Sequence, residues 1–395
     1  IWASDALYYN SGAVTHSSAY NYRANKLAAM IASKIGEDPT PYKQEADKIL
    51  SALNKRLWMP EKGHWAEFQD FMGKKRLHES AAVWTIYHAL DSDAADPFQA
   101  YQATNYVDTD IPHIPVRGEG LKDEGYATVS TTNWLPYSWS INNVAFAEVM
   151  HTSLAYFQAG RADSGFKLLK SSLLDGMYLG ESPGNFGQIS FYDAARGECY
   201  RDFGDPIGVA SRVLIQGLYG ILPDAMNGCL LVKPGFPSDW KYASLHTPDI
   251  DFDFKKAVDS SSYIITHRLS AVRTLELQFP AQSSQVAELL VNGQPAEWKI
   301  LDQSIGHPVL SVIVPANADQ RLDISIRWGG ESLRLNANSD QGGVRPASGY
   351  LSDKAPIRFE PMKQGQMRWW KAVDNVGKQL DSVPVEPNLD RKSVV

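Results

Sequence analysis

The stretch that decides the fold is Glu181–Trp240, which reads ESPGNFGQISFYDAARGECYRDFGDPIGVASRVLIQGLYGILPDAMNGCLLVKPGFPSDW. It begins as an acidic and aromatic loop, continues as an apolar run of helical character and ends in a first β-rich run, CLLVKPG. A change from helical periodicity to a short run rich in branched residues marks the passage from helices to strands. We therefore expect a domain boundary here, with helices ending near Ile221 and β-structure beginning near Cys229.

The loop at the start of this stretch carries Asp193 among glycines and aromatic residues. Further along, Asp205 stands directly before Pro206, a pair typical of the first residues of a helix. We expect Asp205 to cap the helix that follows. Asp193 has no such local role, which makes it the first candidate for chemistry.

Upstream of this loop the apolar residues recur at helical spacing. Short turns alternate with long connections, and long structureless connections are usually functional. If alternate helices form an inner ring, every long loop precedes an inner helix and all of them meet on one face. This alternation predicts an (α/α)6-toroid, incomplete in this chain, with the missing helices before Ile1 and no strands between the helices before residue 180. The predicted helices cover residues 16–35, 42–57, 81–90, 97–106, 141–159, the segment from the GRADS turn to about 174, and 205–221.

Downstream of Gly228 the sequence consists of short β-rich runs separated by turns, such as RLDISIRW with its alternating apolar residues. The runs predict an antiparallel β-sandwich. The expected domains are therefore a toroid over residues 1–226, a sandwich over 227–330, and a linker or partial module over 331–395, in which QMRWWKAV is an isolated strand-like run.

The composition narrows the class of partner. The chain of 395 residues has a formal net charge of −7 and no basic stripe, which argues against nucleic acid and against an anionic membrane surface. No apolar run is long enough to span a bilayer. The N-terminal residues indicate that a longer sequence has been shortened. Two cysteines, Cys199 and Cys229, leave open whether a disulfide forms.

The long loops supply the candidate site residues. Paired carboxyl groups among aromatic rings are typical of glycosidic-bond hydrolysis, in which one carboxyl protonates the leaving oxygen and the other activates water or attacks the sugar. The candidate catalytic residues are Asp193, Glu67, Glu119 and Glu124, and we expect their carboxyl groups to share a cleft. The candidate substrate-binding residues are His16, Trp65, Arg117, Trp134, Tyr137, Trp139 and Tyr192.

Other chemistries find less support in the sequence. There is no HExxH or CxxC motif, no nucleophile elbow and no phosphate-binding glycine loop, so we expect neither a metal nor a cofactor. His88 and His151 fall inside predicted helices and are expected to have no functional role.

Three of these stretches together resemble a known family. GQISFYD at 187–193, the helix ending LYGILPD and the run GCLLVKPGFPSDW resemble the end of the catalytic domain of the α-L-rhamnosidase-like glycoside hydrolases. HSSAYNYRANKLAAMIASKIGED resembles the helical hairpins of that α/α-toroid superfamily, and uncharacterised bacterial polysaccharide-utilisation proteins share the pattern. The resemblance covers residues 1–330. It implies a general base at Asp193, where the family usually has Glu, and a general acid from a loop upstream of Ile1.

The sequence therefore predicts an inverting glycoside hydrolase acting on a plant or bacterial polysaccharide, with Asp193 as base and the acid either upstream or among Glu67, Glu119 and Glu124. We expect it in the periplasm or outside the cell, with an upstream segment completing the toroid. Two alternatives remain. A polysaccharide lyase of the same architecture would use Asn133, Tyr137, His113 and Arg117, and a carbohydrate-binding protein would bind without turnover.

Overall fold

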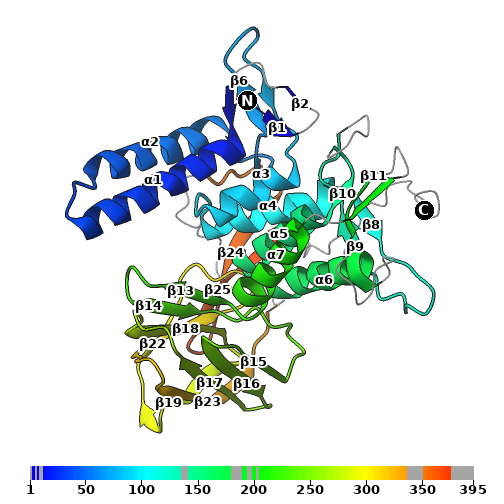
Figure 1. Cartoon of the computed structure of the whole chain (residues 1–395). Coiled ribbons are helices and arrows are strands. Elements are labelled where there is room, and N and C mark those ends of the chain that lie inside the picture. Colours follow the sequence, from blue (N-terminus) through cyan, green and yellow to red (C-terminus); the bar gives the residue numbers. More distant parts are fainter. Residues whose placement is uncertain are drawn as a thin grey trace. The chain divides into compact units, whose positions relative to one another are not determined.

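The computed structural model describes residues 12–134, 141–178, 204–335 and 350–374. It also describes the backbone of strands β1 (Trp2–Ser4), β2 (Leu7–Tyr8), β11 (Ile189–Asp193) and β12 (Glu198–Arg201). The chain divides into two compact units (Figure 1). The first unit comprises residues 1–213, 348–357 and 380–395, and the second comprises 214–347 and 358–379.

The first unit is built mainly from helices, and the second contains two large sheets. The chain therefore contains both helices and sheets, as its sequence predicts. The helices of the first unit are α1 (Thr15–Ile35), α2 (Thr40–Arg56), α3 (Val83–Asp91), α4 (Pro97–Asp110), α5 (Phe146–Gln158), α6 (Ala162–Leu173) and α7 (Asp205–Arg212). Wider π-helical turns extend two of them, as η1 (Leu174–Tyr178) and η2 (Val213–Leu218).

The helix ends follow from local sequence. α1 stops at Gly36, which adopts φ 82° and donates its N–H to the carbonyl of Ala32, a conformation that glycine reaches without strain. α4 begins with a capping box, in which the Asp96 side chain accepts from the Gln99 N–H and the Gln99 side chain accepts from the Asp96 N–H. The expected cap at Asp205 is wrong: Gly204 is the N-cap of α7, and Asp205 is already in the first turn.

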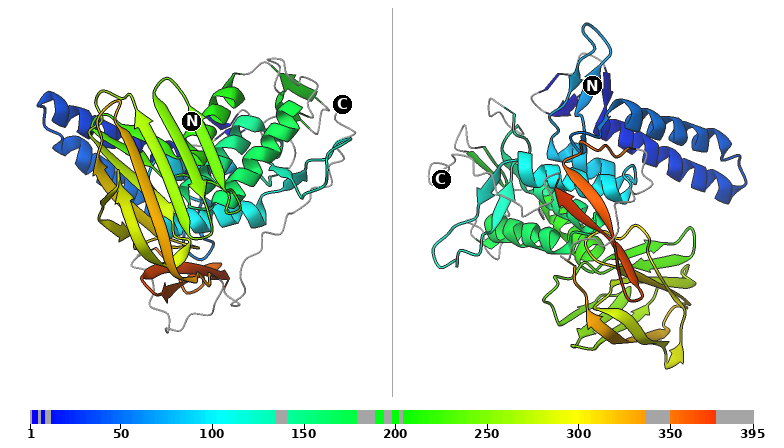
Figure 2. Two further views of the ribbon diagram at one scale, coloured as in Figure 1. Left: turned by 90° about the horizontal axis from the view of Figure 1, so that it is seen from below. Right: turned by 180° about the vertical axis from the view of Figure 1, so that it is seen from behind.

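Alternate helices lie side by side. α1 contacts α3, α3 contacts α5, and α5 contacts α7, while α2 pairs with α1 and α6 with α5. α1 and α2 lie side by side in all three ribbon views (Figures 1 and 2). Buried residues of these helices and their loops, among them Leu53, Leu57, Ile86 and Phe146, form a shared core. These contacts place the odd-numbered helices in one row, in which each helix packs against the next.

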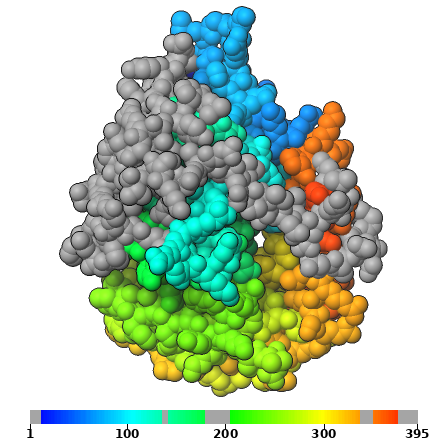
Figure 3. Space-filling model, turned by 90° about the vertical axis from the view of Figure 1, so that its right-hand side faces the viewer, coloured from blue at the N-terminus to red at the C-terminus, as the bar shows by residue number. Residues whose placement is uncertain are grey.

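The connections between hairpins contain short strands, so the expectation of no strands before residue 180 is wrong. Long loops that fold back on themselves pair their own backbone groups, which satisfies donors and acceptors that packing would otherwise leave unbonded. One such hairpin, β6–β7, projects from the surface (Figures 1 and 3). The strands are β3 (Gly12–Val14), β4 (Trp58–Met59), β5 (His64–Trp65), β6 (Phe68–Asp70), β7 (Leu77–His78), β8 (His113–Pro115), β9 (Ala127–Val129) and β10 (Val144–Ala145).

β-Structure of the second unit starts earlier than the sequence predicts, at Ile221 rather than near Cys229, because the helical turns end at Leu218. The turn between them needs Gly220. It has φ 64°, and a Cβ there would lie 2.0 Å from the carbonyl oxygen of Lys233. The GILP sequence therefore makes a tight reversal into the first sheet.

Two sheets make up most of the second unit (Figure 2). The five-stranded sheet has the order β13 (Ile221–Asp224), β14 (Cys229–Val232), β18 (Thr274–Pro280), β22 (Val309–Pro315), β21 (Trp298–Ile300). The six-stranded sheet has the order β15 (Tyr242–His246), β16 (Ile250–Lys256), β17 (Ser260–His267), β23 (Arg321–Ser332), β19 (Ser283–Val291), β20 (Gln294–Pro295). The strand-like run QMRWWKAV forms β25 (Met367–Asp374), which pairs with β24 (Ile357–Gln364).

Alternating side chains of the two sheets are buried against each other. In β17, Tyr263 and Ile265 are buried while Ser262 and Ile264 are not, and the Tyr263 ring lies 5.7 Å from that of Phe279 in the other sheet. The sheets are not wholly antiparallel, because β14 pairs with β18 in parallel. Cys229 at the start of β14 carries a free thiol.

Candidate active site

A group of polar and aromatic side chains gathers where the odd-numbered helices meet. We call it the odd-helix cluster: His16 and Tyr20 of α1, Tyr87 and His88 of α3, and Glu148 and His151 of α5. These residues share a location because their helices are neighbours, although they are far apart in sequence. Tilted and edge-on ring contacts hold the cluster together, and His88 lies at its centre.

The ring geometry is compact. The His88 ring centroid lies 4.4 Å from Tyr20, 4.2 Å from Tyr87, 6.0 Å from His16 and 6.3 Å from His151. The Tyr87 ring also contacts the His151 ring in a tilted arrangement, with the centroids 4.7 Å apart. Tyr87 is buried, whereas the other rings retain some exposed surface. Three helices thus present aromatic faces and ring nitrogens to one another.

Glu148 is the acidic member of the cluster. It lies in the first turn of α5, where its carboxylate Oε2 accepts a hydrogen bond from the Tyr87 hydroxyl. Burial raises the pKa of Glu148 to about 7; the hydrogen bond from Tyr87 opposes this rise, and the negative charge of Asp205 adds to it. A carboxyl group that titrates near neutral pH can hold a proton and release it, which is what a general acid or base needs.

The histidines of the cluster stay neutral at neutral pH. Burial lowers the pKa of His88 to about 3 and that of His151 to about 4. Burial also lowers the pKa of His16, although the nearby Glu67 carboxylate acts in the opposite direction. The cluster therefore offers neutral imidazole rings for hydrogen bonding and stacking, beside one carboxyl group that is part protonated.

The strand that carries Asp193 leads to the same helix as Glu148. β11 pairs with β10, with Tyr192 opposite Val144 and Phe191 opposite Ala145. β10 continues directly into α5, so this three-stranded sheet of β10, β11 and β12 adjoins the first turn that contains Glu148. The backbones of Tyr192 and Asp193 are thereby placed beside α5. The structure describes only the backbone of these two residues.

Glu67 has a different environment from the one expected of a residue in a cleft. It is fully buried, and its carboxylate accepts hydrogen bonds from the Ala82 N–H at 3.0 Å, from Trp84 Nε1 at 2.8 Å and from the Thr85 hydroxyl. These donors belong to the N-terminal end of α3, where a negative charge is stabilised by the unpaired N–H groups. In the described structure Glu67 fastens its loop to the start of α3 through one backbone and two side-chain donors.

His16 is the member of the odd-helix cluster that lies next to Glu67. Its Nδ1 is 3.8 Å from Glu67 Oε1, so the two candidate residues are neighbours. Trp65 comes from the same loop as Glu67 but is fully buried against Trp58, with ring centroids 4.5 Å apart. Its ring therefore forms part of the core.

The acidic loop between β8 and β9 is exposed. Arg117, Glu119 and Glu124 all lie at the surface there. Glu124 accepts a hydrogen bond of 2.5 Å from the Tyr126 hydroxyl, which lowers the pKa of its carboxyl group. A general acid needs the opposite shift, so among the described carboxyl groups the geometry favours Glu148 over Glu124.

Trp134 is partly exposed and donates its indole N–H to the hydroxyl of Ser80 at 3.1 Å. It packs edge-on against Trp84, which also bonds to Glu67. Tyr137 and Trp139 lie outside the described residues. The structure therefore brings His16, Glu67 and, through Trp84, Trp134 into one neighbourhood, and places Arg117, Glu119 and Glu124 on a separate exposed loop.

Asp91, the last residue of α3, forms hydrogen bonds with side chains of the other three odd-numbered helices. Arg212 at the end of α7 binds its carboxylate with two hydrogen bonds, at 3.0 and 2.5 Å, and Gln158 at the end of α5 donates a third at 2.9 Å. Arg23 of α1 donates to the Asp91 backbone carbonyl. Burial alone would raise the pKa of Asp91, but the bonds from Arg212 and Gln158 outweigh it, and the pKa is lowered. This ion pair aligns four helices beneath the cluster.

The sequence did not single out Glu148 or Tyr87 as candidate site residues, and it predicted no functional role for His88. The available signal was FAEVMHTSL, in which Glu148 and His151 are three positions apart in an apolar helix and so share a face. Within the described residues, no three His, Cys, Asp or Glu side chains come together as metal ligands. In the same part of the chain, no helix is long and apolar enough to cross a membrane.

Comparisons with known proteins find solved structures that are similar to this chain. No protein-family model matches the chain, and no curated protein matches it. An α-L-rhamnosidase of Streptomyces avermitilis, in complex with L-rhamnose, is 12% identical, with a TM-score of 0.45 over 79% of this chain and 26% of that one. An α-L-rhamnosidase of Dictyoglumus thermophilum is 12% identical, with a TM-score of 0.45 over 78% of this chain and 31% of that one.

A GH63 mannosylglycerate hydrolase of Thermus thermophilus, in complex with glucose, is 14% identical, with a TM-score of 0.36 over 51% of this chain and 47% of that one. The chain spans about a quarter to a third of the length of the two rhamnosidases it is similar to. The solved structures to which this chain is similar thus include α-L-rhamnosidases, the family that its sequence resembles.

Proposed function

We propose that this chain is part of a glycoside hydrolase that cleaves a complex polysaccharide with two carboxyl groups. The observation that carries the proposal is Glu148, a carboxyl group whose pKa is raised to about 7 inside a cluster of neutral histidines and tyrosines. Hydrolysis by inversion needs one carboxyl group that is protonated and another that is ionised and activates water. Glu148 has the first property.

Asp193 is the base in this proposal. The family resemblance assigns that role to it, and β11 carries its backbone to the sheet that leads into α5. Glu148 is the acid, or holds the proton for an acid supplied by another part of the protein. The aromatic rings of the cluster, with Tyr20 exposed by 47%, offer surfaces on which a sugar ring can stack.

Further helices of the same protein complete the ring of odd helices in this proposal. Support comes from α1, which exposes Leu27, Ile31 and Ile35 along one face, with exposed fractions from 43% to 69%. A row of apolar side chains at helical spacing is typical of a face that packs on another helix. A polysaccharide substrate implies a secreted or periplasmic enzyme.

Turnover by the full-length protein tests the function. The protein is incubated with a panel of neutral and acidic polysaccharides, and new reducing ends are measured. Asp193→Asn keeps the side-chain shape and removes the base, so kcat is expected to fall by about two to four orders of magnitude with little change in KM. Glu148→Gln is expected to lower kcat by a similar factor.

Exposed Glu45→Gln on α2 is the matched control and should leave kcat unchanged. Full turnover by Asp193→Asn would remove the base assignment. Products that absorb in the ultraviolet would show a lyase, and binding of an oligosaccharide without any turnover would show a carbohydrate-binding protein.

A further inference from the structure

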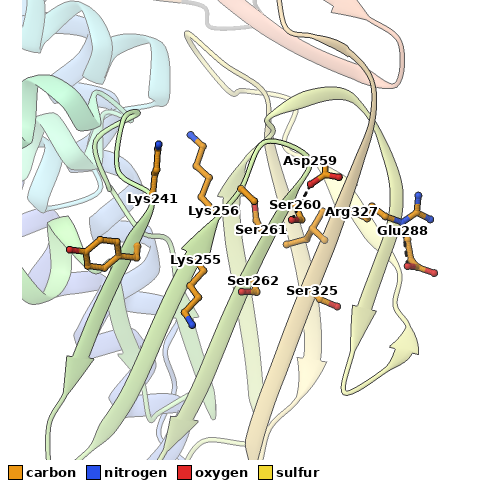
Figure 4. A pocket seen from close by; sticks show the side chains of 13 residues that line it. Lys241, Lys255, Lys256, Asp259, Ser260, Ser261, Ser262, Glu288, Ser325 and Arg327 are labelled. Atoms are coloured by element: carbon orange, nitrogen blue, oxygen red, sulfur yellow. Dashed lines mark hydrogen bonds and ion pairs between the residues drawn. The ribbon is translucent and has the colours of Figure 1, made fainter.

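A cavity of about 780 Å³ lies on the six-stranded sheet of the second unit (Figure 4). Residues of β15, β16, β17, β19 and β23 line it, together with the turns at the ends of these strands. None of the predicted catalytic residues takes part in this lining. The cavity is therefore a feature of the sheet by itself, and it is open to one side.

A row of polar side chains crosses the floor of this cavity. Tyr242 pairs with Lys255, Lys255 with Ser262, and Ser262 with Ser325 on successive strands. Register-paired residues of neighbouring strands point to the same face of a sheet. Since strands lie about 4.8 Å apart, the row spans about 14 Å. Figure 4 shows Ser262 and Ser325 between the lysines and the Arg327–Glu288 pair.

The charge of this cavity differs from that of the chain. Four cationic and two acidic side chains line it, in a protein whose formal net charge is −7. Arg327 is 3.7 Å from Glu288, and the Lys256 ammonium donates to the Ser238 carbonyl at 2.9 Å. Lys241 and Lys255 are exposed, and in the described part of the chain neither is paired with a carboxylate. These two lysines are available to an anionic group.

We propose that this cavity binds an acidic polysaccharide, one whose sugars carry carboxylate or sulfate groups. Lys255, which belongs to the row, binds the anionic group, because charge-assisted hydrogen bonds are stronger than neutral ones. The exposed Lys241 beside the row adds positive charge to the same cavity. Ser262 and Ser325 hydrogen-bond sugar hydroxyls. Tyr242, exposed by 76%, supplies an aromatic surface for a sugar ring at the end of the row. The backbone ladder holds these side chains on a rigid surface, which limits the entropy lost on binding.

The same lining is poorly suited to nucleic acid. Proteins that bind single strands combine a long basic groove with several aromatic platforms for successive bases. Here the lining contains one aromatic ring and two partly exposed serines of β17, Ser260 and Ser262, while Ser261 between them is buried. Hydroxyl groups beside two free cations match a sugar chain that carries occasional charges. The inference concerns the second unit alone and does not depend on the proposed catalytic function.

Equilibrium binding by the full chain tests this site. The probes are polygalacturonate for carboxylate groups, chondroitin sulfate for sulfate groups, neutral dextran, and a single-stranded DNA oligonucleotide. We expect saturable binding of polygalacturonate or chondroitin sulfate, weakened by added salt because exposed charges are screened, and no binding of dextran. Lys255→Gln and Lys241→Gln are each expected to raise Kd by about tenfold.

Lys299→Gln is the matched control, because Lys299 is an equally exposed strand lysine in the other sheet and does not line the cavity. It should leave Kd unchanged. Ser325→Val, which removes an exposed hydroxyl without a charge, should weaken binding of the acidic polysaccharide and keep its salt dependence. The inference is overturned if neither acidic polysaccharide binds, if Lys299→Gln weakens binding as much as Lys255→Gln, or if DNA binds more tightly than both polysaccharides.

Discussion

At the scale of single residues, the Tyr87–Glu148 hydrogen bond connects structure to chemistry. The hydroxyl of Tyr87 donates to the carboxylate form of Glu148 and so opposes the effect of burial on its pKa. Tyr87→Phe removes the donor and leaves the ring. The pKa of Glu148 should therefore rise above its present value of about 7.

If Glu148 must be protonated during turnover, the alkaline limb of the kcat profile is set by its pKa. In Tyr87→Phe that limb should move to higher pH, whereas the acidic limb, set by the base, should stay where it is. A kcat profile of the full-length enzyme from pH 5 to 9 measures both limbs. Tyr126→Phe, which removes a hydroxyl from exposed Glu124, serves as the control. An unmoved alkaline limb in Tyr87→Phe would separate Glu148 from the reaction.

The role of a residue could be predicted from the sequence only where its partners are close to it along the chain. Asp193 is the first candidate because its loop offers it no structural role, whereas Glu67 is a candidate only as a carboxyl group of a long loop. The partners of Glu67, at Ala82, Trp84 and Thr85, lie on a helix 15 to 18 residues away. The partner of Glu148 is 61 residues away. Burial and long-range partners decide the pKa of a carboxyl group, and neither can be read from spacing alone.

At the scale of elements, Asp91 is the point where four helices are joined. Asp91→Asn keeps the shape but removes the charge that pairs with Arg212, whose side chain is 30% exposed. Because the pair is neither deeply buried nor fully exposed, we expect the free energy of unfolding to fall by about 1–3 kcal/mol. Urea unfolding of the full chain at pH 7 measures it.

The neighbouring Asp93 offers a control for that experiment. It forms an ion pair with Lys26 at 3.4 Å, but its side chain is 71% exposed. Asp93→Asn should change the free energy of unfolding by less than about 0.5 kcal/mol. Equal losses in the two variants would mean that Asp91 does not hold the helices together.

Elements with strong periodicity were predicted well, and short elements were not. The helix expected over residues 16–35 runs from Thr15 to Ile35, because its apolar face repeats over many turns. Strands of two or three residues, such as β4 and β5, have no period to detect and depend on pairing between loop segments. For the same reason the parallel pairing of β14 with β18 follows from tertiary contacts and has no signal in the sequence.

At the scale of the whole molecule, the alternation of short and long connections predicts an inner ring of alternate helices, and the structure shows α1, α3, α5 and α7 in contact in that order. The alternation does not predict which side chains these helices bring together. Packing of α1, α3, α5 and α7 places histidines and one carboxyl group together in a partly buried environment. This shared burial shifts several pKa values at once, so it also determines how stability depends on pH.

Three histidines should make the protein acid-sensitive. Burial lowers the pKa of His64 to about 4, of His88 to about 3 and of His151 to about 4. Unfolded histidines bind protons below about pH 6.5, whereas these three stay neutral in the folded chain. Their contribution to stability is therefore present above pH 6.5 and is lost as the pH falls toward 4. Glu148 acts in the opposite sense, because its raised pKa keeps a proton bound in the folded state between about pH 4.5 and 7.

Through these four groups alone, the unfolded chain should bind about two more protons than the folded chain near pH 5.5, so they should lower stability by about 2–3 kcal/mol per pH unit on acidification. Burial also lowers the pKa of His16, His113 and His267, which acts in the same direction. Thermal unfolding between pH 7.5 and 5 measures this slope. Two variants of α5 test its origin with opposite signs. His151→Gln removes one histidine and should flatten the slope, whereas Glu148→Gln removes the opposing carboxyl group and should steepen it. If both variants change the slope in the same direction, or if the parent is equally stable at pH 7.5 and 5, the odd-helix cluster does not titrate as its burial requires.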